Sequence, residues 1–261
     1  MPSAASLAGF QVGKMVEVAE RYYMTRGRLE RWLAELEQPE GERVALYVKP
    51  GHLSPYLESI GHECGNWLQE IKGLPASLVE SETGLVLLWS DDRKYVLLPP
   101  FPVDLDQFFP AWDASYLRVL LDKKYLLGVV LLRLGGYSVG VFEGDRLLTS
   151  KTGTRFVKGR HRAGGQSQRR FERRREEQAR ELFDKACSVV TTKFGDYEKR
   201  LDYVFLGGDR LTLHSFLKRC EYLQGLAGKT LARVLNVGKP RYEALRNAPS
   251  QIWKTRVFVV R

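Results

Sequence analysis

The sequence predicts an α/β protein in which a smaller N-terminal α+β domain precedes a domain built on a mixed sheet with flanking helices. Three observations support this fold class. Apolar runs and helical patterns alternate along the second half of the chain. A proline-rich stretch over residues 99–110 separates the two halves. The chain has 261 residues, 44% of them hydrophobic, which suffices for two cores. We therefore expect domains at residues 1–115 and 116–261.

The first half shows one helical pattern and three strand patterns. A helix is predicted over Tyr22–Glu37, because its apolar residues follow the i, i+3, i+4, i+7 spacing of an amphipathic helix. Arg43–Val48 is typical of a strand. Gly84–Trp89 and Lys94–Leu98 flank a polar turn, so we expect a hairpin there.

The second half begins with three strands and a long helix. Tyr125–Leu134, Tyr137–Phe142 and Arg146–Phe156 are apolar or alternating runs joined by glycine-containing turns, which predicts neighbouring strands. The polar loop Gly159–Ser167 follows, and an amphipathic helix is predicted over Arg169–Lys193.

The remaining elements alternate between strand and helix. We expect strands over Asp202–Leu206, Leu231–Val237 and Ile252–Val260, and helices over Leu211–Leu223 and Arg241–Asn247. We assign the last of these strands to the second domain.

Cysteine usage and hydropathy predict the compartment. The three cysteines form no CxxC pair and are odd in number, so we expect neither a disulfide framework nor a zinc site. The longest strongly apolar run, Tyr125–Leu132, is too short to span a bilayer, and the first residues lack a signal-peptide pattern. These features predict a cytoplasmic protein in a reducing environment.

Positive charge is concentrated in one short stretch. Between Arg155 and Arg175 stand nine basic residues and one acid, so this stretch carries +8 of the net charge of +10. A cluster of this kind is typical of a protein that binds a polyanion such as RNA.

The loop inside this basic stretch contains the tripeptide Gly164-Gly165-Gln166. Two glycines can adopt a positive φ and let the backbone approach RNA closely. A solvated glycine loop and an RNA-binding hairpin without catalysis are the simpler interpretations. Histidine can shuttle protons because its ordinary pKa lies near neutrality, but we expect His161 to contact RNA and not to shuttle protons. The predicted RNA contacts are Arg155, Lys158, Arg160, His161, Arg162, Arg169, Arg170, Arg173 and Arg174, and the eight arginine and lysine residues among them would contact phosphates.

Residues Gly164–Arg174 resemble the GGQ loop and following helix of class-1 peptide release factors of the eukaryotic and archaeal type, and a weaker similarity extends over residues 123–261. The resemblance implies their middle domain, with a protruding loop that reaches the peptidyl transferase centre. Residues 1–115 contain no NIKS-like tetrapeptide for reading stop codons. We also expect no C-terminal domain for recruiting a GTPase. The chain is more similar to the VLRF proteins, release-factor-like peptidyl-tRNA hydrolases of ribosome-associated quality control.

This resemblance implies a stop-codon-independent peptidyl-tRNA hydrolase that acts on stalled ribosomes or large subunits. Gln166 would be catalytic with Gly164 and Gly165, and the partners would be large-subunit rRNA and peptidyl-tRNA. For residues 1–115 three roles stay open, because their sequence does not choose among them: docking on a ribosomal subunit, holding an adaptor, or shielding the catalytic domain. Two alternatives remain open: a tRNA endonuclease acting near the acceptor end, and a ribosome-binding factor without catalysis.

We expect no cofactor, metal or membrane partner, and a monomer. The stretch over residues 225–230 imitates a phosphate-binding loop, but Leu223 stands where a Walker A motif needs glycine, so no nucleotide is expected either.

Overall fold

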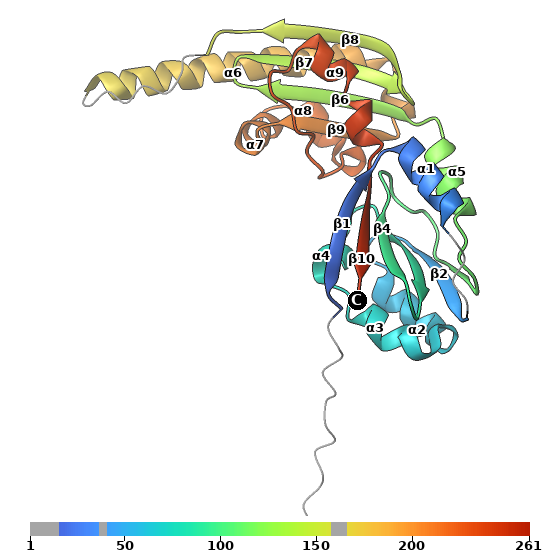
Figure 1. Cartoon of the computed structure of the whole chain (residues 1–261). Coiled ribbons are helices and arrows are strands. Elements are labelled where there is room, and N and C mark those ends of the chain that lie inside the picture. The colour runs from blue at the N-terminus through green and yellow to red at the C-terminus, as the bar shows by residue number, and fades with distance from the viewer. Residues whose placement is uncertain (1–15, 37–40, 158–165) are drawn as a thin grey trace, which may run out of the picture. The chain divides into compact units, whose positions relative to one another are not determined.

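The computed structural model describes residues 16–36, 41–157 and 166–261. The described part forms two compact units, each with its own sheet (Figure 1). One unit comprises the described residues up to Leu121 together with Lys254–Arg261, and the other comprises Asp122–Trp253. Both contain helices and strands, which confirms the α/β class.

The first unit is built on a six-stranded antiparallel sheet in the order β1-β10-β4-β3-β2-β5. Its strands are β1 (Val18–Met24), β2 (Arg43–Val48), β3 (Leu85–Ser90), β4 (Lys94–Leu98), β5 (Gln107–Phe109) and β10 (Thr255–Val260). Its helices include α1 (Arg26–Glu35), α2 (Leu53–Cys64), α3 (Leu68–Lys72), α4 (Ala76–Val79) and α5 (Ser115–Asp122). Leu57 of α2 and Ile71 of α3 belong with Leu87 and Trp89 of β3 to one buried apolar cluster.

Predictions for the first half are confirmed where the signal is local. The hairpin of β3 and β4 forms as expected, and β2 has the predicted bounds. The helix predicted over Tyr22–Glu37 is wrong at its start, because Tyr22 and Tyr23 lie in β1 and α1 begins at Arg26. β1 forms by pairing with β10, a partner at the far end of the chain that local spacing cannot reveal.

β10 connects the last residues of the chain to the first sheet. It pairs with β1 on one side and β4 on the other. From the sequence this strand was assigned to the second domain, whereas its hydrogen bonds are made to the first sheet. The apolar pattern of Val257, Phe258 and Val260, all buried, predicts a strand but not its partners.

The second unit is built on a four-stranded mixed sheet in the order β8-β7-β6-β9. β6, β7 and β8 form an antiparallel meander, and β9 runs parallel to β6. The strands are β6 (Leu126–Arg133), β7 (Gly136–Glu143), β8 (Arg146–Thr154) and β9 (Tyr203–Gly208). The helices include α6 (Gln166–Gly195), α7 (Arg210–Leu217), α8 (Glu221–Gly225), α9 (Tyr242–Arg246) and α10 (Pro249–Ile252). A mixed sheet with flanking helices was predicted here.

Helices cover both faces of this sheet. The C-terminal half of α6 buries Leu182, Ala186 and Val190 in one cluster with Val139 and Val141 of β7. On the opposite face, a Cβ on Gly140 would lie 3.0 Å from Leu245 of α9, so α9 packs there. Gly128 of β6 is needed for close packing of α6, since a Cβ at that position would lie 2.7 Å from the ring of Phe194.

Two elements of the second half differ from prediction. The helix expected over Leu211–Leu223 is interrupted: α7 ends at Leu217 and α8 begins at Glu221. The strand expected over Leu231–Val237 is reduced to isolated bridges, in which Thr230 and Leu235 pair with β9. Apolar residues of this segment are buried without a regular ladder.

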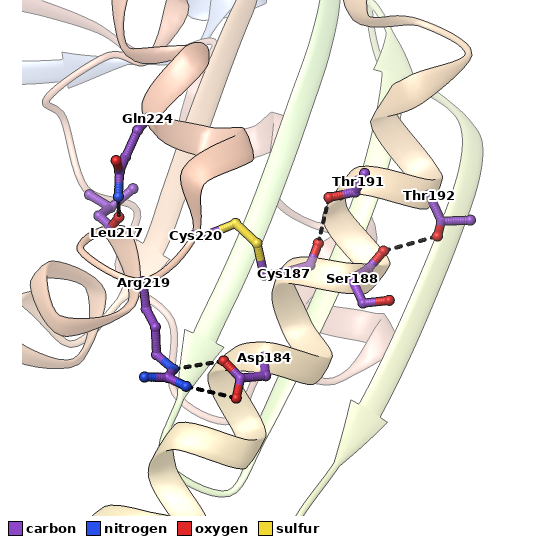
Figure 2. Close-up of a disulfide and its surroundings, with 9 residues drawn as sticks. All are labelled: Asp184, Cys187, Ser188, Thr191, Thr192, Leu217, Arg219, Cys220 and Gln224. Atoms are coloured by element: carbon purple, nitrogen blue, oxygen red, sulfur yellow. Dashed lines mark hydrogen bonds and ion pairs between the residues drawn. A yellow bond between two sulfur atoms is a disulfide. The ribbon is translucent and has the colours of Figure 1, made fainter.

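A disulfide joins Cys187 of α6 to Cys220, the residue that precedes α8 (Figure 2). The expectation of no disulfide is therefore wrong. The two cysteines are 33 residues apart in sequence, and only the packing of α6 beside the α7–α8 connection brings their Cα atoms to 5.5 Å. Next to the disulfide, Arg219 donates to both carboxylate oxygens of Asp184 at 2.6 and 2.9 Å, and these hydrogen bonds lower the pKa of Asp184.

Reduction of this disulfide is expected to destabilise the second unit. A cross-link that closes a loop of this length lowers the conformational entropy of the unfolded chain. This stabilises the folded state by about 3–4 kcal/mol. For a chain of this size that corresponds to a fall in Tm of roughly 6–16 °C. Thermal denaturation followed by circular dichroism, with and without dithiothreitol, measures the effect. The double variant Cys187→Ala/Cys220→Ala is the control: it should start at the lower Tm and not respond to the reductant. Equal Tm values for the oxidised and reduced wild type would contradict the expectation.

Candidate functional site

The candidate site lies where the chain leaves the second sheet at the end of β8 and returns as α6. Residues 158–165 between these elements are outside the described part of the chain. The predicted site residues that fall there are Lys158, Arg160, His161, Arg162, Gly164 and Gly165. Their assignments stay predictions. Gln166 is described as the first residue of α6.

α6 divides into a packed half and an exposed half. From Leu182 onward the helix buries one face on the sheet, whereas the described side chains from Gln168 to Arg174 are all exposed. We call residues 166–180 the arm. At 1.5 Å per residue, the arm is about 22 Å long. Figure 1 shows α6 extending past the end of the sheet by this exposed half.

The sequence of the arm explains why it stays helical without a core. It contains no glycine, proline or β-branched residue, and most of its residues are good helix formers. Gln168 donates to Glu172 at 3.1 Å, and Arg180 lies 3.9 Å from Glu176, both at the i, i+4 spacing that stabilises helices. The arm is therefore supported mainly by its own turns.

Four predicted phosphate contacts form a stripe along the arm. Arg169, Arg170, Arg173 and Arg174 are all exposed. At about 100° per residue they fall within one sector of roughly 140°, on the side opposite the buried face of α6. Within the described residues, no salt bridge involves any of the four. We call these residues the arginine stripe; it presents guanidinium groups to the surroundings and not to the protein.

Arg155 differs from the stripe. It follows β8 and forms an ion pair with Glu181 of α6, with both side chains a little under half exposed. Lys193, nearer the end of α6, donates to the hydroxyl of Thr149 on β8 at 3.0 Å. These contacts fix the helix against the last strand of the meander. The RNA contact predicted for Arg155 stays a prediction, and its charge is already partly balanced by an acid.

A second basic feature, which no sequence pattern had singled out, lies at the same end of the sheet. A cavity of about 650 Å³ is lined by the β6–β7 turn over residues 133–136, by Thr154, by the start of α7 and by residues 238–241. We call it the sheet-end cavity. Its basic residues are Arg133, Lys239 and Arg241. The available signal was the Gly-Lys-Pro-Arg sequence at 238–241, a basic turn between two predicted elements.

The segment that imitates a phosphate-binding loop has a structural role. The ammonium group of Lys229 donates to the backbone carbonyl of Leu201 at 2.6 Å and to that of Glu198 at 3.2 Å. Among the described residues, no three His, Cys, Asp or Glu side chains are grouped so that they could hold a metal ion. In those ranges, every helix is too short or too polar to cross a lipid bilayer.

Comparison with known proteins supports a relation to translation factors. Peptide chain release factor subunit 1 of Methanopyrus kandleri is 32% identical over 154 residues, which cover 58% of this chain and 37% of that protein. The corresponding factor of Aeropyrum pernix is 27% identical over 262 residues, covering 88% of this chain and 69% of that protein. The chain thus spans little more than a third of the length of the Methanopyrus relative.

Solved structures are similar only at a low level. The crystal structure of the archaeal translation termination factor aRF1 has a TM-score of 0.35 and 17% identity, covering 87% of this chain and 71% of that one. Dom34 of S. cerevisiae has a TM-score of 0.32 and 8% identity, covering 88% of this chain and 66% of that one.

A family model gives the sharper result. The model described as Actinobacteria/chloroflexi VLRF1 release factor, acVLRF1, matches residues 125–258, just over half of the chain. The match spans β6 to β9, the whole of α6 and the basic loop before it. The chain therefore belongs to the acVLRF1 family of release factors.

Proposed function

We propose that this chain hydrolyses peptidyl-tRNA on stalled ribosomes or large subunits, independently of a stop codon. The observation that carries the proposal is the arm, an exposed helix with an arginine stripe that begins at Gln166, directly after Gly164 and Gly165. Membership of a release factor family supports it.

The charge and shape of the arm suit entry into an RNA cavity. A helix of about 10–12 Å diameter with guanidinium groups on one side can contact phosphates along its length. Such contacts hold a protein in register on RNA without reading its sequence. The arginine stripe would position the tip of the arm, and the tip would supply the chemistry.

The position of Gln166 at the start of α6 suits it for that chemistry. The first four N–H groups of a helix have no partner within the helix and lie at the positive end of its dipole. The N–H of Gln166 would stabilise the oxyanion that develops on the ester carbonyl or on the departing ribose oxygen. The side-chain amide would orient the attacking water.

The reaction is an ester hydrolysis. Water attacks the carbonyl carbon that joins the peptide to the terminal ribose of the tRNA, the carbon–oxygen bond to the ribose breaks, and a proton passes to that ribose oxygen. The arm has no histidine, and we propose that the tRNA 2′-OH and ribosomal RNA handle the proton. The products are a free peptide carboxylate and an intact deacylated tRNA.

The experiment incubates the protein with three complexes carrying labelled peptidyl-tRNA: isolated large subunits, ribosomes stalled with an empty A site, and ribosomes at a stop codon. We expect peptide release from the first two, with no further gain from a stop codon. Gel analysis of the tRNA gives the reaction type. An intact tRNA supports hydrolysis, a tRNA shortened at its 3′ end supports the endonuclease alternative, and unchanged peptidyl-tRNA at every protein concentration supports a factor without catalysis. Parallel reactions without protein control for spontaneous hydrolysis.

A further inference from the structure

The sheet-end cavity combines positive charge with walls that are fixed in place. We propose that it binds a ribose-phosphate unit of RNA, as a second contact beside the root of the arm. The inference rests on the proposed function in one respect: the RNA is the one that the arginine stripe contacts. It assigns a binding role to Arg133 at the end of β6 and to Lys239 and Arg241 in the turn over residues 238–241.

The walls of the cavity are held in place by side chains that donate hydrogen bonds to the backbone carbonyls of its lining segment. Arg133 donates through Nη1 to the carbonyls of Val237 at 3.0 Å and Gly238 at 3.2 Å. Ser138, fully buried on β7, donates to the carbonyl of Pro240 at 2.8 Å and lies 2.8 Å from the hydroxyl of Thr152. The basic turn over residues 238–241 is thus anchored to β6 and β7 at two points.

The charge available to a ligand is positive. Lys239 and Arg241 are exposed at the cavity, and within the described residues their side chains have no salt-bridge partner. The one acid in the lining, Asp209, accepts hydrogen bonds from the backbone N–H of Thr212 at 3.0 Å and from its hydroxyl at 2.9 Å. These bonds lower the pKa of Asp209 and direct its carboxylate toward the start of α7. Three cations therefore face one acid that is already engaged.

The size and lining of the cavity favour sugar and phosphate over a stacked base. About 650 Å³ is more than a lone phosphate needs. The lining contains glycine, threonine, leucine and proline but no aromatic side chain on which a base could stack. Arginine and lysine with exposed backbone are the groups that contact RNA phosphates.

The location of the cavity connects it to the arm. Thr154 lines the cavity and is the last residue of β8, from which the chain enters the basic loop. Gly136, opposite Thr154 in the β7–β8 ladder, lines it too. RNA that contacts the arginine stripe near the root of the arm would lie close to this end of the sheet, so one strand would reach both features.

Two glycines provide a matched pair of variants for a test. Gly238 lines the cavity and has no positive φ, and a Cβ added there would meet open space, so the backbone accepts a side chain at this position. Gly228 has the same properties but lies outside the cavity lining. Gly238→Glu places bulk and negative charge in the cavity, whereas Gly228→Glu makes the same change in net charge elsewhere in the second unit.

The measurement is fluorescence anisotropy of a labelled 12-nucleotide single-stranded RNA with the full chain, at several salt concentrations. We expect Gly238→Glu to bind on the order of tenfold more weakly than wild type and Gly228→Glu to bind within about twofold of it. The double variant Lys239→Ala/Arg241→Ala, which leaves the backbone anchors in place, should reduce the slope of log K against log salt by roughly 1.4. Equal losses in both glutamate variants would overturn the proposal, because net charge alone would explain them. The proposal would also be overturned if Gly238→Glu bound with wild-type affinity and the double variant kept the wild-type salt slope.

Two further measurements make the outcomes specific. Binding by the same variants to deacylated tRNA and to isolated large subunits assigns the contact to tRNA or to ribosomal RNA. If the variants bind both as tightly as wild type does, the proposal is overturned. Gln166→Ala should bind the RNA like wild type. If the wild type releases no peptide but the cavity variants weaken RNA binding as expected, only the proposed function is refuted. If the wild type releases peptide but the cavity variants bind RNA like wild type, only this inference is refuted.

Discussion

Replacing Gln166 with alanine is expected to lower the rate of peptide release by about 10²- to 10³-fold, the usual effect of removing one group that acts on the transition state. The change removes the side-chain amide but keeps the backbone N–H at the start of α6. Alanine is a strong helix former, so the arm should persist and affinity for the ribosome should stay near wild type. The measurement is single-turnover release of labelled peptide from large subunits at saturating protein.

Gln168→Ala is the matched control for this variant. Gln168 has the same side chain two residues later, is exposed, and donates to Glu172 within the arm. Its replacement should change release by less than about twofold, because it loses only one surface hydrogen bond worth a few tenths of a kcal/mol. Equal release by Gln166→Ala and wild type would refute the role of the side chain.

A proline at the same position separates the two donors of Gln166. Proline is tolerated at the first position of a helix and has no N–H. If the backbone donor contributes, Gln166→Pro should be slower than Gln166→Ala by a further 10-fold or more. Equal rates for the two variants would assign the whole effect to the side chain.

Removal of the arginine stripe is expected to have the second large effect. The fourfold variant Arg169→Ala/Arg170→Ala/Arg173→Ala/Arg174→Ala loses four exposed guanidinium groups. If each contacts one phosphate, the slope of log K against log salt for large-subunit binding should fall by about 3 to 4. Between 50 and 200 mM salt, a slope difference of this size amounts to roughly 100-fold in relative affinity. Filter binding or sedimentation across this salt range measures it.

Arg180→Ala provides the control for the stripe. Arg180 stands in the same helix but pairs with Glu176 at the i, i+4 spacing. Its replacement should leave the salt slope unchanged within about 0.5, since no phosphate contact is lost. An unchanged slope in the fourfold variant would show that the arm does not contact RNA through these arginines. Circular dichroism should confirm that the arm stays helical, because alanine has the highest helix propensity.

The sequence predicted those elements whose signal is contained in neighbouring residues. The strands β2, β3 and β4 were predicted within one residue at each end, because each apolar run is closed by a turn. α6 was predicted because its buried residues recur at helical spacing over many turns, although it begins three residues earlier than expected. The turn chemistry of glycine likewise indicated the meander of β6, β7 and β8.

The elements that were missed depend on partners distant in sequence. β1 is exposed over most of its length, with Tyr22 and Tyr23 37% and 50% exposed, and it is a strand because β10 supplies its hydrogen bonds. The disulfide was missed because Cys187 and Cys220 have no spacing signature and meet only through helix packing. The sheet-end cavity assembles residues from four segments, so no single stretch of sequence could indicate it.

For the candidate site, the local sequence indicated the positive charge and the Gly-Gly-Gln tripeptide. The structure added the direction in which α6 extends from the sheet. Helical spacing alone cannot say that α6 extends past its sheet, because that depends on where the buried face ends. The end of that face at Leu182, together with the ion pair of Arg155 and Glu181, defines where the arm joins the packed half of α6.

The position of β10 has a consequence for the order in which the chain folds. Translation produces β1 to β5 first, then the whole of Asp122–Trp253, and only afterwards the strand that belongs between β1 and β4. The second unit is therefore an insertion whose residues are all synthesised while the first sheet still lacks one of its interior strands. Until that strand arrives, β4 has an open edge, and open edges are sites of misassociation between nascent chains. In this topology, the two segments that form the first sheet can pair fully only after the whole inserted unit has been synthesised.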